Sequence, residues 1–366
     1  MTIDDATRET TRLGTSGHRR YVRTGFIGAG GMARYWLNAF RQVEAARVIA
    51  VADVLPEAAE KAAAKFGIPN VHAGLDICDR DDLDLICITT PDHLHAEPFV
   101  RALQAGKHVI VEKPLGNTME DLHTMCAAAR DSDRKVLVGH VLQFMPYFMQ
   151  VKDLIDAGEV GEVFYLEADY IHNLRGQAHP SRFNSAIGMN WWLQEEKPMV
   201  GGGTHPLGAL SWFLNSPPVE VQAYSHRLVF PQMVHDASMV AIFRFACGAI
   251  AKVTALYWCV TPYAEANHLA VYGTKATIRR QAICRSEKDG FVPLPVRWGG
   301  GKPMVAEVEH MIGCILNDRE PKVGCIEGAQ AAVAGIMAEE AAQKRCAVPI
   351  PTFDEYRRVA QKGTMR

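Results

Sequence analysis

Hydrophobic positions in the first part of the chain alternate between two spacings. Short continuous apolar runs, which suit buried strands, are followed by segments with apolar residues at helical spacing. The pattern predicts strands at residues 21–27, 47–53, 70–73, 83–88, 108–111 and 136–138. It predicts intervening helices at residues 32–40, 56–66, 97–105 and 119–130. Strands and helices alternating at this pitch indicate an α/β domain with a doubly wound parallel sheet, over residues 21–142.

Beyond residue 158 the pattern changes to longer β-prone runs separated by turn signals. The predicted strands lie at residues 163–170, 219–229, 239–245, 250–258 and 269–272. Two helices are predicted near the end, at residues 305–316 and 329–344. Few helices between strands are typical of a mostly antiparallel sheet, so we predict a second, α+β domain over residues 143–366. The polar residues 1–20 are predicted to form a flexible arm.

Composition narrows the class of protein. A chain of 366 residues is long enough for two domains, and a net charge of −2 gives no reason to expect nucleic acid or an acidic membrane as a partner. Nine cysteines without a Cys-x-x-Cys pair suit a reducing compartment and argue against a structural zinc site. No apolar run is as long as a transmembrane helix. We therefore expect a cytoplasmic protein without a metal site.

The first predicted junction between strand and helix is rich in glycine. It reads Gly28-x-Gly30-x-x-Ala33, in which the first glycine permits a tight turn and the second lets the backbone approach a pyrophosphate. The alanine lets helix and strand pack closely. Because phosphates bind the unpaired N–H groups at a helix start, Gly31 and Met32 belong to the same predicted dinucleotide site.

The next strand ends in an acidic residue. Asp53 stands at about the distance from the glycine turn that is expected of the group binding the ribose hydroxyls. Its carboxylate would repel the 2′-phosphate of NADP, and the following residue, Val54, offers that phosphate no polar side chain. The sequence therefore predicts NAD as the cofactor, with NADP less favoured.

Two polar segments directly follow later strands, at the sheet edge where open α/β folds bind ligands. The first contains Thr90, Pro91 and His95, and the second contains Glu112 and Lys113. A lysine at the mouth of a cofactor cleft can take part in proton transfer, whereas an arbitrary loop lysine is a surface residue.

With residues 105–109 (Ala-Gly-Lys-His-Val), these motifs closely resemble the Gfo/Idh/MocA family, named for glucose–fructose oxidoreductase, inositol dehydrogenase and a rhizopine-catabolism protein. The resemblance continues into residues 153–162, the usual entry to the second domain. It implies a Rossmann domain followed by an open-faced sheet domain, bound NAD(P), and hydride transfer on a sugar or polyol. It further implies a homodimer or homotetramer formed through the open sheet face.

The resemblance also implies roles for single residues. It places Lys113 beside the nicotinamide and the reacting hydroxyl, and it makes Thr90, Pro91, His95 and Glu112 line the cofactor. These assignments are carried over from the family and do not follow from spacing alone.

In the second domain the family usually has a histidine and, three residues later, an acid, on a helix that faces the substrate. His205 matches the histidine, while Gly208 stands in place of the acid, and Gln143 replaces a more usual arginine. Helix positions three apart share a face, so we expect position 208 to look into the same cleft as His205. We expect the room at Gly208 to accommodate a substrate bulkier than a free monosaccharide, such as a glycoside.

Residues 171–200 show no periodicity and are rich in polar and aromatic side chains. Long irregular connections inside compact domains are either functional or disordered. Aromatic faces beside amide and guanidinium groups suit sugar recognition, so His172, Arg175 and Trp192 are candidate substrate contacts together with Gln143 and His205. Packing in the core is the alternative for the tryptophans.

Three functions are compatible with these features. The favoured hypothesis is an NAD-dependent oxidoreductase acting on a sugar, glycoside or polyol, in which Lys113 takes part in proton transfer and His205 assists. The second is a glycoside-cleaving enzyme that oxidises its sugar transiently with bound NAD. The third is a catalytically silent NAD-binding sensor, which Gly208 favours mildly and Lys113 disfavours.

Overall fold

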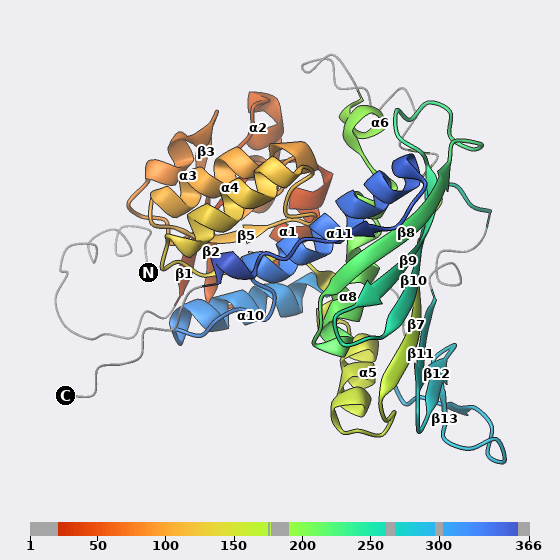
Figure 1. Ribbon diagram of the computed structural model, residues 1–366. Coiled ribbons are helices and arrows are strands. Elements are labelled where there is room, and N and C mark those ends of the chain that lie inside the picture. The colour runs from red at the N-terminus through yellow and green to blue at the C-terminus, as the bar shows by residue number, and fades with distance from the viewer. Residues whose placement is uncertain (1–20, 175, 177–189, 261–267, 297–302, 358–366) are drawn as a thin grey trace.

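The structure is a computed structural model, which describes residues 21–174, 176, 190–260, 268–296 and 303–357. The predicted flexible arm at residues 1–20 lies outside the described residues. The chain forms two separate β-sheets with helices around and between them (Figure 1). No helix in the described ranges is both long and apolar enough to cross a membrane.

The first sheet has six parallel strands in the order β3-β2-β1-β4-β5-β6. Its strands are β1 Val22–Ile27, β2 Ala46–Ala52, β3 Asn70–His72, β4 Leu85–Ile88, β5 His108–Val111 and β6 Val136–Val138. Its helices are α1 Gly31–Phe40, α2 Pro56–Phe66, α3 Ala96–Gln104 and α4 Met119–Arg130, with the short 3-10 helices η2 Leu75–Asp79 and η3 Asp92–Leu94. Every side chain of β4 is buried, as expected of a strand covered on both faces. The predicted doubly wound sheet is confirmed.

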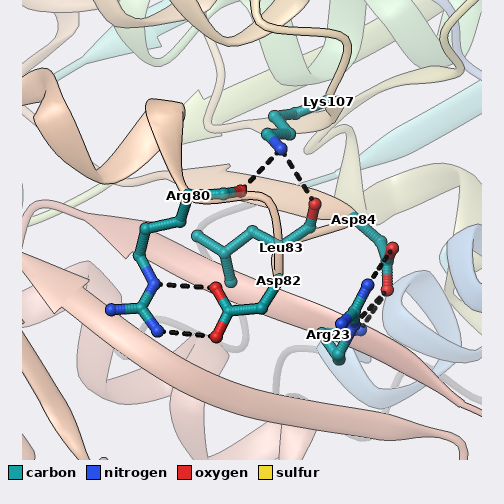
Figure 2. A network of polar contacts seen from close by, with 6 residues as sticks. All are labelled: Arg23, Arg80, Asp82, Leu83, Asp84 and Lys107. Carbon is teal, nitrogen blue, oxygen red and sulfur yellow. Dashed lines mark hydrogen bonds and ion pairs between the residues drawn. The ribbon is translucent and has the colours of Figure 1, made fainter. Parts of the chain in front are cut away.

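Polar side chains at the amino ends of these strands form a network of paired groups (Figure 2). The buried ammonium of Lys107 donates to the carbonyl oxygens of Arg80, at 2.7 Å, and Leu83, at 3.1 Å. Arg23 in β1 donates to both carboxylate oxygens of Asp84, at 3.1 Å each. Because these contacts lie before β4 and β5, Lys107 fixes the amino end of the sheet.

The second sheet has nine strands in the order β14-β13-β12-β11-β7-β10-β9-β8-β15. They are β7 Val163–Ile171, β8 Pro218–His226, β9 Ser238–Phe245, β10 Ile250–Leu256, β11 Leu269–Gly273, β12 Thr277–Arg279, β13 Ala282–Cys284, β14 Val292–Pro293 and β15 Val348–Pro349. Neighbouring strands are antiparallel except for β7 and β10. This confirms the predicted mostly antiparallel sheet.

Helices cover one face of the second sheet. The helices that follow the first sheet in the chain are α5 Pro146–Asp156, α6 Trp191–Glu195, α7 Pro198–Gly201, α8 Thr204–Leu214, α10 Met304–Leu316 and α11 Cys325–Lys344, with the 3-10 helices η4 Val141–Phe144 and η7 Asp354–Tyr356. The helices α8 and α11 pack on this sheet, and its opposite face carries no helix among the described residues (Figure 1). The predicted irregular stretch at residues 171–200 contains α6 and all but the last residue of α7.

The last two long helices also contact the first domain. The helix α10 packs against α1 and β1, and α11 packs against α4 and β6 as well as β8. Close approach of α11 depends on glycine, because a Cβ on Gly328 would lie 2.6 Å from Val138 Cγ2 and one on Gly335 would lie 2.7 Å from the Met199 carbonyl oxygen. The boundary between residues 142 and 143 stays a prediction.

Candidate active site

The glycine turn after β1 provides an open backbone surface at the start of α1. Gly28 has a φ of +95°, and a Cβ there would lie 2.7 Å from the carbonyl carbon of Thr89. A Cβ on Gly30 or Gly31 would meet no atom within 4 Å. These two glycines line a hollow of about 670 Å³ between α1 and α2. Open space at backbone N–H groups on a helix start fits a dinucleotide pyrophosphate.

Asp53 lies at the end of β2, next to this turn. Its Oδ2 accepts a hydrogen bond from the Ala29 N–H at 2.7 Å, and its Oδ1 accepts one from the Leu55 N–H at 2.9 Å. The carboxylate is therefore held in place by the backbone, with further lone pairs available for ribose hydroxyls. The same hollow is lined by three basic residues, Arg34, Lys61 and Lys65.

Two of the predicted cofactor residues hold loops together. The buried ring of His95 lies 2.8 Å, through Nδ1, from the Pro114 carbonyl oxygen and 3.1 Å, through Nε2, from the Thr90 carbonyl oxygen. It therefore joins the loop after β4, where Pro91 precedes η3, to the loop after β5. Direct contact of Thr90, Pro91 and His95 with a cofactor stays a prediction.

Glu112 is a second loop-fixing residue. Its buried carboxylate accepts hydrogen bonds from Trp36 Nε1, at 2.7 Å, and from the backbone N–H of Lys113, at 3.1 Å. It thereby ties α1 to the segment that carries the lysine, and its contact with a cofactor also stays a prediction.

Lys113 reaches from the carboxyl end of β5 into the second domain. Its Nζ donates to the carbonyl oxygen of Gly201 in α7, at 3.0 Å. A Cβ on Gly201 would lie 1.9 Å from Glu196 Oε1, so the absence of a side chain there makes room for the Glu196 carboxyl group. Lys113 and Glu196 therefore both contact Gly201.

Glu196 is a candidate site residue that the sequence reasoning missed. Burial, and then the nearby Asp92 carboxylate, raise its pKa to about 8. Its carboxyl group also accepts a hydrogen bond from the hydroxyl of Tyr257, whose own pKa burial and Glu196 raise well above the usual value. In the sequence Glu196 stands in a charged run, Glu-Glu-Lys, which is typical of a solvent-exposed surface.

His205 lies in the first turn of α8, as the resemblance implies. Its ring stacks on Tyr170, with centroids 5.7 Å apart and planes 17° apart. The Tyr170 hydroxyl lies 3.3 Å from His172 Nδ1. The structure therefore brings together His172 and His205 through one tyrosine, although the two were singled out for different reasons.

The contacts of Trp192 favour packing in the core over binding of the substrate. It stacks on Tyr257, with centroids 5.5 Å apart, and packs against the buried Phe230 at 5.6 Å. These rings belong to a small apolar cluster with Met233 and Ala237. Its ring nonetheless lies next to the tyrosine that contacts Glu196. The other candidate from this stretch, Arg175, lies outside the described residues.

The expectation of open room at Gly208 is wrong. A Cβ on Gly208 would lie 2.7 Å from Nδ1 of His140, so the imidazole fills the space that a side chain would need. Gln143 is buried beside it and donates from Nε2 to the Gly208 carbonyl oxygen at 3.3 Å. The space beside Gly208 is therefore filled by His140, which follows β6 and packs directly on α8.

His140 has an unusual environment for an ionisable group. It is 1% exposed, and neither ring nitrogen has a hydrogen-bond partner among the described residues. Burial, and then the charge of Lys113, lower its pKa to about 4. The ring is therefore neutral at physiological pH and lies near the lysine without pairing with it.

Comparison with known sequences decides the family. Residues 22–140 match the oxidoreductase family with an NAD-binding Rossmann fold, GFO/IDH/MocA, and residues 148–279 match the C-terminal domain of the same family. The chain belongs to the GFO/IDH/MocA family. It is accordingly a member of an oxidoreductase family with an NAD-binding Rossmann fold, and the glycine turn and Asp53 lie within the matched residues.

The chain can be aligned with individual relatives over different shares of its length. The chain is 28% identical to a 1,5-anhydro-D-fructose reductase of Ensifer adhaerens over 74% of its length and 79% of the relative. It is 30% identical to a glycosyl hydrolase family 109 protein of Shewanella amazonensis over 53% of its length and 45% of the relative. A levoglucosan dehydrogenase solved with NADH and L-sorbose has the same fold, with a TM-score of 0.80, 22% identity, and coverage of 91% and 100%.

The described part of the chain offers no preformed metal-binding site. The described ranges contain no group of three or more histidine, cysteine, aspartate or glutamate side chains placed to hold an ion. The ionisable groups that do converge, around Gly201 and Gly208, are a lysine, two carboxyl groups and a histidine. Such a set is suited to moving protons.

Proposed function

We propose that this family member is an NAD-dependent oxidoreductase that transfers a hydride between a hydroxyl-bearing carbon of a sugar, glycoside or polyol and nicotinamide. The observation that carries the proposal is the contact of Lys113, from the cofactor domain, with Gly201 in the second domain. This contact sets the lysine at the meeting point of the two domains, beside the segment that leads to His205. Bound NAD would supply the hydride acceptor, while the protein moves the hydroxyl proton.

The roles of the residues follow from their contacts. Lys113 would exchange the proton of the substrate hydroxyl, and His205, held by its stacking on Tyr170, would assist and position that hydroxyl. His172 and Gln143 would bind other polar groups of the substrate. Carbohydrate chemistry is supported by the sugar- and anhydrosugar-acting relatives, whose sequence similarity covers both domains.

NAD is proposed over NADP because Asp53 would repel a 2′-phosphate. The three basic residues in the hollow oppose this preference, since they offer cations to that phosphate. We expect tighter binding of NAD than of NADP in a fluorescence titration of both reduced cofactors. Equal dissociation constants would contradict the proposal.

A second candidate function has a specific observation in its favour. The similarity to a glycosyl hydrolase family 109 protein reaches 30% identity, although it covers 45% of that protein. We therefore keep transient oxidation of a glycoside, followed by release of its aglycone and return of the hydride, as the alternative. A silent sensor is less favoured because Lys113 and His205 are both present, although Gly208 stands in place of the usual acid.

One experiment separates these functions. Purified protein is incubated with NAD and a panel of monosaccharides, inositols, anhydrosugars and aryl glycosides. Net NADH formation supports the dehydrogenase, and aglycone release without net NADH supports the glycoside-cleaving enzyme. Tight NAD binding with neither reaction would support the sensor and overturn the proposal. Lys113→Met serves as the inactive variant, and Lys288→Met, at an exposed lysine, is its matched control.

Self-association through the open face of the second sheet is also proposed. Tyr224 on β8 and its cross-strand neighbour Val240 on β9 are 75% and 42% exposed, and Ile242 next along β9 is 45% exposed. Apolar side chains grouped on an uncovered sheet face favour a protein interface. Light scattering after gel filtration should give at least a dimer, and Ile242→Lys should shift it toward the monomer. A monomeric wild type would contradict this.

A further inference from the structure

Glu196, Asp92 and Tyr257 form a polar cluster that the proposed reaction does not yet use. Asp92 lies in η3 after β4, Glu196 lies between α6 and α7, and Tyr257 follows β10. The Asp92 carboxyl group lies close to that of Glu196, and the tyrosine hydroxyl donates to Glu196. Two carboxyl groups this close favour keeping one proton between them, because two neighbouring carboxylates repel each other.

The pair lies beside the proposed reaction centre. Lys113 Nζ donates to the Gly201 carbonyl oxygen, and the Glu196 carboxyl group occupies the space where a side chain of Gly201 would be. Glu196 is 5% exposed, whereas Asp92 is partly exposed. The pair thus extends from the surroundings of the lysine toward solvent.

Building on the proposed function, we propose that Glu196 and Asp92 hold one shared proton beside Lys113 and carry protons between this lysine and solvent. During oxidation bound NAD would take up the C–H hydrogen of the substrate as a hydride, and the O–H proton would pass to Nζ of Lys113. The ammonium then gives this proton to the carboxylate of the pair, through a water or a substrate hydroxyl. Asp92 releases a proton to water, which restores the starting state.

The electrostatic surroundings suit this role. Glu196 faces Asp92 and Lys113 from the first domain and Tyr257 from the second, while His140 is a further titratable group near the lysine. A pKa near neutrality allows a group to accept and release protons at similar rates, and the raised pKa of Glu196 meets this condition. Glu196 is a positioning and proton-holding residue in this scheme, and Lys113 is the catalytic one.

The first test measures protons and needs no substrate. If NAD⁺ binds as proposed, its nicotinamide ring would add a positive charge near the pair, which would lower the pKa of a neighbouring acid and drive its proton off. Calorimetric titration of NAD⁺ at about pH 8, in two buffers with different heats of ionisation, gives the number of protons released. Wild type should release a fraction of a proton, and Glu196→Gln should release clearly less.

A matched control is Glu339→Gln, which removes another glutamate whose pKa burial raises, on α11 near Lys197 and Asp236. It should release as many protons as wild type. Equal release from wild type and Glu196→Gln, or no release from wild type, would overturn the proposal. Asp92→Asn provides a second variant of the pair if Glu196→Gln does not fold, and it is also expected to reduce proton release.

The second test needs no cofactor. In the unfolded chain a glutamate loses its proton near pH 4.3, whereas folded Glu196 keeps it to higher pH. Between these values the folded state binds more protons, so stability should fall as pH rises through this interval. Glu196→Gln should flatten that slope, and Glu57→Gln, at an exposed carboxylate, should leave it unchanged. An unchanged slope in Glu196→Gln would overturn the shared proton.

These outcomes separate the inference from the proposed function. Proton release and the pH slope report on the carboxyl pair whether or not a sugar reacts. A substrate panel without any reaction would count against the dehydrogenase and would leave both measurements as expected. Where wild type does turn over, Glu196→Gln should also lose the dependence of kcat on pH near neutrality.

Discussion

The two edges of the first sheet use polar residues in opposite ways. At the amino edge, Lys107 donates to two carbonyl oxygens and Arg23 pairs with Asp84 (Figure 2). At the carboxyl edge, the buried Glu196 carboxyl group lies close to Asp92, and the buried His140 has no hydrogen-bond partner among the described residues. At the amino edge the charged side chains are paired within the fold. At the carboxyl edge ionisable side chains are buried in surroundings that lower the stability of the folded state.

Two histidines make the comparison sharper, because burial lowers the pKa of each to about 4. His108 lies at the amino end of β5, and its Nδ1 accepts a hydrogen bond from the Lys135 N–H at 2.9 Å. His140 lies after the carboxyl end of β6 and lacks such a bond. The same shift in pKa therefore accompanies a satisfied structural ring at one edge and an unsatisfied one at the other.

The difference indicates where the fold gives up stability. A buried polar group without a partner costs about 1–3 kcal/mol, so such groups persist where function needs them. The carboxyl edge is also where open α/β sheets bind ligands. We therefore expect substitutions at the amino edge to change stability alone and substitutions at the carboxyl edge to change turnover.

The largest expected effect is that of Lys113→Met. The substitution keeps the bulk of the side chain and removes the ammonium, so turnover should fall by roughly 10²-fold or more if the lysine moves a proton in the transition state. NAD affinity and thermal stability should change far less. Steady-state kinetics, a cofactor titration and calorimetry together check this, with Lys288→Met as the control. Loss of the fold along with cofactor binding would instead show a structural lysine.

Lys107→Met is the counterpart at the amino edge. It leaves the carbonyl oxygens of Arg80 and Leu83 without their buried donor, which should lower the free energy of unfolding by about 2–3 kcal/mol. The remaining folded protein should have wild-type kcat and KM. Denaturant unfolding and kinetics at a temperature well below the transition measure the two effects. A fall in kcat of the folded enzyme would break the division between the two edges.

Gly208→Ala tests whether His140 fills the room beside α8. The new methyl group would lie 2.7 Å from His140 Nδ1, so the ring must move, and we expect a loss of about 1–2 kcal/mol of stability. The matched control is Gly313→Ala on α10, where the nearest atom to the new Cβ is 3.7 Å away. That variant should gain up to about 1 kcal/mol from helix propensity. A stabilised Gly208→Ala would contradict the close contact.

The smallest expected effect is the acid sensitivity of His140. Its folded pKa lies below its unfolded value, so the folded state binds fewer protons and stability falls as pH drops below about 6.5. Between about pH 6.5 and pH 5 this amounts to about 1–2 kcal/mol. His140→Gln should flatten this part of the pH–stability curve and also lower kcat. His108→Gln should also flatten the pH–stability curve but leave kcat unchanged. If both substitutions changed kcat equally, the proposed difference between the two sheet edges would be wrong.

Much of the fold was predictable because it depends on local patterns. Continuous apolar runs marked the buried parallel strands, and glycines after helical segments marked helix ends, as at Gly67 with a φ of +70°. The glycine turn and Asp53 were predictable for the same reason. A tight turn after the first strand and an acid at the end of the second each require one residue type at one spacing. The predicted start of α11, at residue 329, is four residues too late. The helix begins at Cys325, and its first turn contains a glycine at position 328, directly before the predicted start.

The sequence by itself determined the two-sheet architecture and the glycine turn, and it made Lys113 and His205 candidates, because motif spacing and hydrophobic period are properties of neighbouring residues. Only the tertiary structure decided that Lys113 meets Gly201, that Glu196 of a charged run is buried against Asp92, and that His140 takes the room of the side chain missing at Gly208. These contacts join segments about 60 to 100 residues apart, and the burial that shifts the pKa of Glu196 and His140 follows from packing between distant segments rather than from the residue type.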